Sequence, residues 1–193
     1  MQIESGTGDR SLARVDKEHN LHTRAIILSE FGHHSLDEES GYGVYMRHTF
    51  TAGVGNNEYL GHVINNGLDN IVIKQVTVAT NAVSMKVEMF FDTVYTSGGE
   101  LAIPLNLNRG SKKESSLVAY HENPTVIVMS TAAEKEFLDL RTGTGMPSFT
   151  YDFRDAFVLA PQTTFGFVGE ASSAGEKVRL NVYYYELTEE LDD

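Results

Sequence analysis

The chain has 193 residues, a formal net charge of -12 and no cysteine. This length fits one domain, which buries roughly 70% of the surface of its unfolded chain and therefore folds without a metal or a disulfide. The missing cysteines exclude disulfide cross-links and thiol redox chemistry. The negative charge disfavours nucleic acid and membranes as partners, because both are anionic; solubility and a binding role both remain as explanations for it.

Residues 1–23 are rich in Gly, Ser, Asp and Asn and show no sustained apolar period. This composition predicts an extended N-terminal arm. The first residues have neither the basic region nor the apolar run of a secretory signal, so we expect synthesis and retention in soluble form.

Residues 24–193 show the pattern of short β-strands, in which apolar side chains occupy every second position. Turn-forming residues at 53–57, 65–70, 97–99 and 172–175 separate several of these runs. We expect strands at 24–30, 42–50, 59–65, 70–78, 83–91, 118–121, 125–129, 151–159, 164–168 and 177–187. The pattern predicts an all-β fold, a single antiparallel β-sandwich or barrel over residues 24–193. One short helix over 135–140 is suggested by the capping box Thr131–Glu134.

Catalytic and metal-binding motifs are weak in this chain. His33 and His34 are adjacent, so on a strand they point to opposite faces, unlike the alternating histidines of a cupin; we interpret them as part of a polar loop. His48, His62 and His121 occur singly on expected strands, and we assign them structural roles and no metal. Nucleophile and phosphate-loop motifs are missing, and acidic pairs such as Asp152 with Asp155 are expected by chance. We therefore expect no enzymatic activity and no cofactor.

The last expected strand has two unlike faces. One face carries Val178, Leu180, Val182 and Tyr184, which is typical of a core. The opposite face carries Arg179, Asn181, Tyr183 and Tyr185. Tyrosines beside a charge and an amide suit a surface that binds another protein, but a loop of the same chain covering them explains the pattern equally well.

Three segments together resemble a known family. The leader from Gly8 to Arg24 is similar to "G-x-x-x-x-A-x-V-D-x-x-N-x-L", matched at Gly8, Ala13, Val15, Asp16 and Leu21, with Asn20 one position after the asparagine of the pattern. Leu105-Asn-Leu-Asn-Arg-Gly-Ser111 resembles an "N-x-N-R-x-S" segment, and residues 158–167 followed by 178–187 look like a closing hairpin. The family is the jelly-roll head decoration, or cement, proteins of tailed bacteriophages.

The resemblance implies a jelly-roll-like sandwich made in the host cytoplasm that binds the capsid exterior of the virion. It implies that the chain forms a homotrimer and that it binds the major capsid protein. The arm residues expected to contact the shell or a neighbour are Arg10, Leu12, Arg14, Val15, Asp16 and Leu21. The residues expected at the oligomer interface are Asn106, Asn108, Arg109, Arg179, Tyr183 and Tyr185.

Two alternatives remain open. A carbohydrate-binding or host-recognition β-sandwich module, in a head fibre or at the neck or tail, uses aromatic side chains such as Tyr183 and Tyr185 but usually also tryptophan, and the chain has no tryptophan. For the arm, the alternative is a tail without a binding role.

Overall fold

The computed structural model describes residues 14–15, 21–22, 35, 39–122, 124–128, 140–142 and 148–187. Fifteen β-strands lie in this part of the chain. They are β1 (Arg14–Val15), β2 (Leu21–His22), β3 (Gly41–Thr49), β4 (Glu58–Asn65), β5 (Ile71–Thr80), β6 (Met85–Phe91), β7 (Thr93–Ser97), β8 (Glu100–Ala102), β9 (Leu105–Asn106), β10 (Leu117–His121), β11 (Thr125–Val128), β12 (Leu140–Thr142), β13 (Ser148–Leu159), β14 (Thr164–Ala171) and β15 (Lys177–Glu186).

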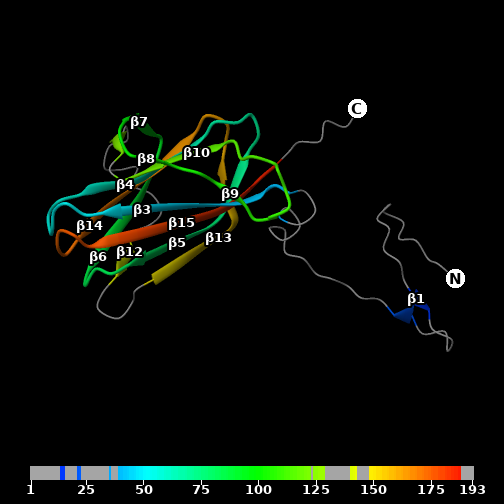
Figure 1. Ribbon diagram of the computed structural model, residues 1–193, viewed down its shortest axis with the longest axis horizontal. Coiled ribbons are helices and arrows are strands. Elements are labelled where there is room, and N and C mark those ends of the chain that lie inside the picture. The colour runs from blue at the N-terminus through cyan, green and yellow to red at the C-terminus, as the bar shows by residue number, and fades with distance from the viewer. Residues whose placement is uncertain are drawn as a thin grey trace.

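Two antiparallel sheets pack against each other and form a β-sandwich (Figure 1). The first sheet has the strand order β13-β5-β15-β3-β9. The second has the order β12-β6-β14-β4-β10-β8. The expected all-β sandwich is therefore confirmed.

Eight of these strands follow the connectivity of a jelly roll. Four of them, β3, β15, β5 and β13, are consecutive neighbours in the first sheet, and β4, β14, β6 and β12 are consecutive neighbours in the second. The chain passes between the sheets at every step except from β6 to β12, which pair with each other. Two interlocked Greek keys of this kind make a jelly roll.

The chain between β6 and β12 adds strands outside these eight. β10 and β8 extend the second sheet beyond β4, and β9 extends the first sheet beyond β3. β7 pairs with β11 in a separate two-stranded sheet, and Gly98 and Gly99, both with φ of 76°, form the turn between β7 and β8. Glycine suits this turn because a positive φ costs it little. β8 and β9 become the outermost strands on one side of the sandwich.

The core lies between the two sheets and follows the predicted alternation. In β15 the residues Val178, Leu180, Val182 and Tyr184 are all fully buried, and Tyr184 stacks on Tyr42 of β3 with ring centroids 5.6 Å apart. Rings from the second sheet close the core on its far side, where Phe165 and Phe167 of β14 meet edge to face at 5.5 Å. Large buried aromatic pairs of this kind dominate core energetics.

Several sequence expectations need correction. The expected strand 83–91 begins at Met85, and Val83 is exposed. Glu88 and Phe90 are buried although they lie on the face of β6 that points away from the core. The strands β7, β8, β9 and β12 were not expected, and Leu140 begins β12 instead of ending a helix. The expected strand 24–30 and the remainder of the expected helix lie outside the described residues.

Candidate functional site

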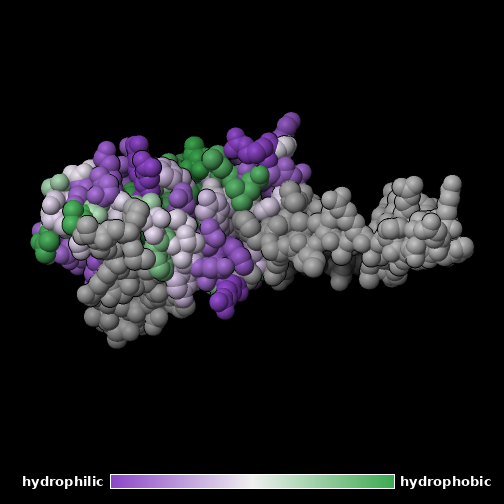
Figure 2. Space-filling view, turned by 90° about the horizontal axis from the view of Figure 1, so that it is seen from below, coloured by the Kyte–Doolittle hydropathy of each residue, from purple (hydrophilic) through white to green (hydrophobic). Residues whose placement is uncertain are grey.

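An exposed row of aliphatic side chains runs along one side of the sandwich. β8 and β9 are the terminal strands of the two sheets there, and the extended segment from Glu100 to Asn108 passes from one to the other. Leu101, Ile103, Leu105 and Leu107 are between 37% and 73% exposed, while Ala102 between them is buried. We call these four residues the apolar edge. On the face drawn in Figure 2, hydrophobic surface gathers in small areas beside strongly hydrophilic side chains.

The alternation of an extended chain explains this exposure, because residues at odd positions point away when those at even positions point toward the body. Asn106 is one of the inward residues. Its Nδ2 donates to the carbonyl oxygens of Glu39 at 2.6 Å and Lys113 at 3.3 Å, and its Oδ1 accepts from the Asn108 backbone N–H at 2.8 Å. Asn108 Oδ1 accepts from the Gly110 N–H at 3.1 Å. The two asparagines expected at the interface therefore brace the loop that follows the apolar edge.

That loop carries three exposed cations, Arg109, Lys112 and Lys113, which we call the basic loop. Its far end is fixed to the sandwich by the carboxylate of Glu186 at the end of β15. Glu186 Oε1 accepts from Ser115 Oγ at 2.7 Å and from the N–H and Oγ of Ser116 at 2.8 Å and 3.0 Å. The basic loop is thus held at both ends, which gives its charges a defined place beside the apolar edge.

The structure brings Tyr183, another expected interface residue, close to the apolar edge. Tyr183 of β15 is directly opposite Gly43 of β3, and Gly43 is opposite Leu105 of β9. A Cβ at Gly43 would lie 3.3 Å from the Tyr183 ring and 3.7 Å from Leu107 Cδ2, so both side chains border this glycine. Tyr183 is half-buried and continues the apolar edge onto the outer face of the first sheet.

Tyr185 and Arg179, which were also expected at the interface, do not contribute to the surface that Tyr183 and the apolar edge form. Tyr185 is only 1% exposed, so the expectation that it meets another copy is wrong. In the sheet, Tyr185 pairs with Gly41 of β3 and with Val72 of β5. Ser40 and Val72 are also buried at this end of the first sheet. The Glu186 N–H donates to Ser40 O at 3.1 Å. Arg179 is exposed but lies farther along β15, opposite Arg47.

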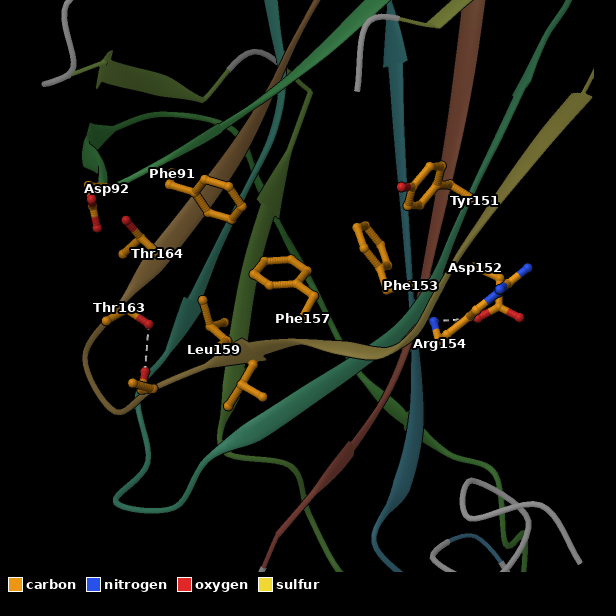
Figure 3. A pocket seen from close by; sticks show the side chains of 12 residues that line it. Phe91, Asp92, Tyr151, Asp152, Phe153, Arg154, Phe157, Leu159, Thr163 and Thr164 are labelled. Carbon is orange, nitrogen blue, oxygen red and sulfur yellow. Dashed lines mark hydrogen bonds between the residues drawn. The ribbon is translucent and has the colours of Figure 1, made fainter. Parts of the chain in front are cut away.

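A pocket of about 1010 Å³ opens on the opposite side of the sandwich. We call it the aromatic pocket. Figure 3 shows the rings of Phe91, Phe153 and Phe157 turned toward a common space, with Tyr151 at one end. Its lining residues come from the end of β6, from β13 and from the start of β14: Phe91, Asp92, Tyr151, Asp152, Phe153, Arg154, Phe157, Val158, Leu159, Ala160, Thr163 and Thr164.

A bulge in β13 opens this pocket. Asp152 pairs with Gln75 and Phe157 pairs with Ile73, so β13 contains extra residues relative to β5. Arg154 in the bulge has φ of 53°, and its N–H donates to Asp152 Oδ1 at 2.8 Å. Asp92 across the pocket has φ of 51°. Bulges and positive φ values at residues other than glycine recur at binding sites, because they redirect side chains that a regular strand would align.

The rim of the aromatic pocket carries charges of both signs. Arg154 is exposed and lines the pocket together with Asp92 and Asp152. Asp92 and Asp152 are both exposed, and Asp152 Oδ1 lies 3.8 Å from Lys74 Nζ. Phe157 touches Phe91, Phe153 and Phe165 at centroid distances of 5.2 Å, 5.1 Å and 5.4 Å. The pocket therefore has a wall of connected aromatic rings below a rim that bears both acidic and basic side chains.

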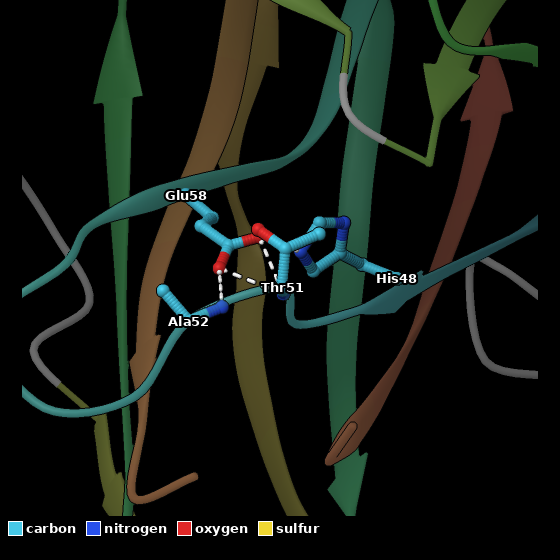
Figure 4. Close-up of polar contacts among 4 residues, drawn as sticks. All are labelled: His48, Thr51, Ala52 and Glu58. Carbon is cyan, nitrogen blue, oxygen red and sulfur yellow. Dashed lines mark hydrogen bonds and ion pairs between the residues drawn. The ribbon is translucent and has the colours of Figure 1, made fainter. Parts of the chain in front are cut away.

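His48 is held by a carboxylate that also closes the β3–β4 turn (Figure 4). Glu58 Oε2 lies 3.0 Å from His48 Nε2, and Glu58 Oε1 accepts from the N–H groups of Thr51 at 2.9 Å and Ala52 at 2.8 Å. Burial alone would raise the pKa of Glu58, but the hydrogen bonds outweigh it and the pKa is lowered. Burial lowers the pKa of His48, although Glu58 opposes this effect. The pair fastens the turn.

His62 and His121 also have structural positions. His62 of β4 is fully buried, its Nδ1 lies 2.9 Å from Thr93 Oγ1, and its ring stacks on Tyr95. Burial lowers the pKa of His62 to about 4. His121 is buried at the end of β10. Among the described residues, His, Cys, Asp and Glu form no group of three or more that is arranged to hold a metal ion.

The expected arm is described at four residues only. Arg14 and Val15 form β1, which pairs antiparallel with Leu21 and His22 of β2. Arg10, Leu12 and Asp16, together with His33 and His34, lie outside the described residues. In the parts of the chain that the structure describes, no helix has the length and apolar character needed to cross a membrane.

Comparison of the chain with protein-family models, with curated proteins and with solved structures found no match.

The aromatic pocket was missed by the sequence reasoning, because its rings occupy positions that the alternation assigns to the core. The apolar edge had a visible signal in the alternating Leu101, Ile103, Leu105 and Leu107, within the segment that carries part of the family resemblance.

Proposed function

We propose that this chain is a structural protein of a tailed-bacteriophage virion, which decorates and stabilises the capsid exterior as a symmetric oligomer. The proposed oligomer is a homotrimer, and the proposed partner is the major capsid protein. The chain performs this role without a cofactor or catalysis.

The observation that carries the proposal is the apolar edge beside the basic loop. A row of four exposed aliphatic side chains is costly to leave in water, and such surfaces mark protein contacts. The braces from Asn106, Asn108 and Glu186 hold this row and the neighbouring cations in place before binding. A surface that is ordered in advance loses less conformational entropy on association.

The fold and the charge are compatible with this role. Jelly rolls occur in viral capsid proteins, lectins and cupins, so the fold alone leaves the function open, and the sequence resemblance favours the first group. An acidic chain avoids packaged DNA. Several copies placed on a symmetric shell bind multivalently, so that modest contacts add up to a tight hold.

The test is a capsid-binding assay. Capsids that lack the native protein are incubated with the purified chain and sedimented, and the bound chain is quantified against the major capsid protein. We expect saturation at a fixed ratio and a higher melting temperature of the decorated shell. A chain that stays in the supernatant at micromolar concentration refutes the proposal.

A carbohydrate-binding or host-recognition module is the second candidate. Tyr45 is exposed on β3 and lies diagonally across from Tyr183 of β15, and the two rings share the outer face of the first sheet. Flat aromatic surfaces of this kind stack on sugar rings. A glycan array separates the two functions, because specific glycan binding by the isolated chain, without capsid binding, favours this second candidate.

A further inference from the structure

We propose that the aromatic pocket is a binding site for a neutral oligosaccharide, whose sugar rings lie against the aromatic wall while their hydroxyl groups bond to the polar rim. This activity goes beyond capsid decoration and uses a different surface of the chain. The pocket is also a different site from the outer face of the first sheet, where the second candidate function places a sugar.

Strained backbone is concentrated around this pocket. Among the described residues, five other than glycine have a positive φ. Two of them, Asp92 and Arg154, line the pocket. A third, Gln162 with φ of 61°, lies in the turn between the lining residues Ala160 and Thr163. Such conformations are unfavourable for residues with a side chain and collect at ligand sites, where they hold binding groups in position in advance. The strain therefore marks the aromatic pocket as a pre-organised site.

The pocket has an apolar middle and polar ends (Figure 3). The rings of Phe91, Phe157 and Phe153 follow one another through the middle, with Asp92 at one end and Asp152 at the other. A pyranose ring has the same distribution, because C–H groups cover its faces while hydroxyl groups project from its perimeter. Aromatic side chains offer flat apolar surface to such a face. A sugar that lies on the rings therefore directs its hydroxyl groups toward both polar ends.

The charges at the rim favour a ligand without net charge. The carboxylates of Asp92 and Asp152 are accompanied by the exposed Arg154 and by Lys74, whose Nζ lies 3.8 Å from Asp152 Oδ1. These two acidic and two basic side chains offset each other, so the rim selects neither an anion nor a cation. Carboxylates accept and guanidinium groups donate hydrogen bonds, and each of these planar groups has room for two neighbouring hydroxyl groups. A neutral oligosaccharide supplies both donors and acceptors for them.

The size and the place of the pocket suit such a ligand. Its volume of about 1010 Å³ is at the upper end of the range for sites that bind drug-sized ligands, about 300–1,000 Å³, so it takes more than one sugar ring. It is lined by β13 at one end of the first sheet, whereas the apolar edge belongs to β9 at the other end and to β8. A chain that is attached to a capsid through its apolar edge therefore turns the pocket toward the solution.

The probe is an array of neutral, sialylated and sulfated oligosaccharides, followed by calorimetric titration of the full chain with the neutral glycan that gives the strongest signal. Phe91→Leu removes one flat ring of the pocket but keeps an apolar side chain. Asp92→Asn removes a charged acceptor and leaves a residue that tolerates a positive φ. Tyr45→Leu is the matched control for Phe91→Leu, because Tyr45 is 45% exposed on β3, outside the pocket. Circular dichroism and thermal melts verify that each variant is folded.

The wild-type chain should bind neutral glycans in preference to sialylated or sulfated ones. Its affinity should change less than about twofold between about 50 and 500 mM salt, because screening has little effect on an uncharged ligand. Phe91→Leu and Asp92→Asn should each weaken binding about tenfold, the first by the loss of a ring contact and the second by the loss of a charged acceptor. Tyr45→Leu should bind like wild type.

Three results overturn the inference: no neutral glycan bound by wild type, a preference for sialylated or sulfated glycans, or full affinity in both pocket variants. Loss of affinity in Tyr45→Leu alone also overturns it and places the sugar on the outer face of the first sheet.

Sedimentation with capsids distinguishes this failure from failure of the proposed function. Phe91→Leu should sediment with capsids as wild type does, because the pocket lies away from the apolar edge. If this variant loses capsid binding, the pocket faces the capsid protein and the sugar site is wrong. If glycan binding behaves as described but the chain does not bind capsids, the sugar site stands and the decoration function falls.

Discussion

His62 should make the fold sensitive to acid. This residue is fully buried and its pKa in the folded chain is about 4, against an ordinary value of 6.5. Between pH 6.5 and about 4, His62 therefore binds a proton in the unfolded chain but not in the folded chain. As a result, the free energy of unfolding falls as the pH drops below 6.5 and levels off below about 4. The difference between the two pKa values corresponds to about 3 kcal/mol, a large part of the stability of a typical domain.

The perturbation is His62→Asn, which removes the titrating ring and keeps a polar atom near Thr93 Oγ1. The variant loses stability at pH 7 because the ring contact with Tyr95 is gone, but its stability should depend less on pH. Urea unfolding followed by circular dichroism, at one protein concentration and at pH 7, 5.5 and 4, measures the difference. Between pH 7 and 4 wild type should lose about 3 kcal/mol more than the variant.

Thr93→Val is the control for this experiment. It removes the hydrogen-bond partner of His62 Nδ1 but leaves the titrating ring in place, so stability should fall at every pH while the acid sensitivity persists. Contributions from the other acidic groups and from His48 are common to all three proteins and cancel in the comparison. Equal pH dependence of wild type and His62→Asn would refute the reasoning.

Three further predictions concern the turn, the sheet and the arm. Glu58→Gln should lower the free energy of unfolding by about 1–3 kcal/mol at pH 7, because three donors lose a charged acceptor. In urea unfolding this difference should begin to shrink as the pH falls below 4.5, the ordinary value for a glutamate, and it should vanish only below the lowered pKa of Glu58 in the folded chain. Gly169→Ala should lower the free energy of unfolding by about 1–3 kcal/mol, because the new Cβ would lie 2.9 Å from Lys86 O and 2.7 Å from Leu60 Cδ1. Gly110→Ala is the control. Its Cβ would meet only Asn108 Oδ1 at 3.5 Å, so its thermal melt should match that of wild type. Deleting residues 1–23 should leave the thermal melt nearly unchanged but weaken sedimentation with capsids, and equal binding by both forms would exclude a binding role for the arm.

The long strands of this fold were predictable because their side-chain period is regular. In β15 the alternation of Val178, Leu180, Val182 and Tyr184 identified the buried face correctly. The alternation of apolar residues identifies one buried face of a strand but does not show whether another part of the chain covers the opposite face. For this reason Tyr185 was expected at the surface although it is buried. The strands β9 and β12 are too short to show a period, and their pairing with β3 and β6 depends on partners far along the chain.

The candidate site was predictable only in part, for similar reasons. The exposure of Leu105 and Leu107 follows from the place of β9 at the end of a sheet, which the sequence does not reveal. The aromatic pocket depends on a bulge between Asp152 and Phe157, and that bulge is defined by the register of β13 against β5. Apolar residues in a strand look the same in sequence whether they fill a core or line a pocket.

Quantitative mass spectrometry of purified virions tests the central claim most directly. Virions produced from the genome that encodes this chain are purified through a density gradient, and the chain is quantified against the major capsid protein. A capsid decoration protein should be present at a reproducible stoichiometry, one trimer for each equivalent site on the shell, and should be lost from virions when its gene is deleted. Virions that lack the chain, or contain only irreproducible traces of it, would contradict the proposed function.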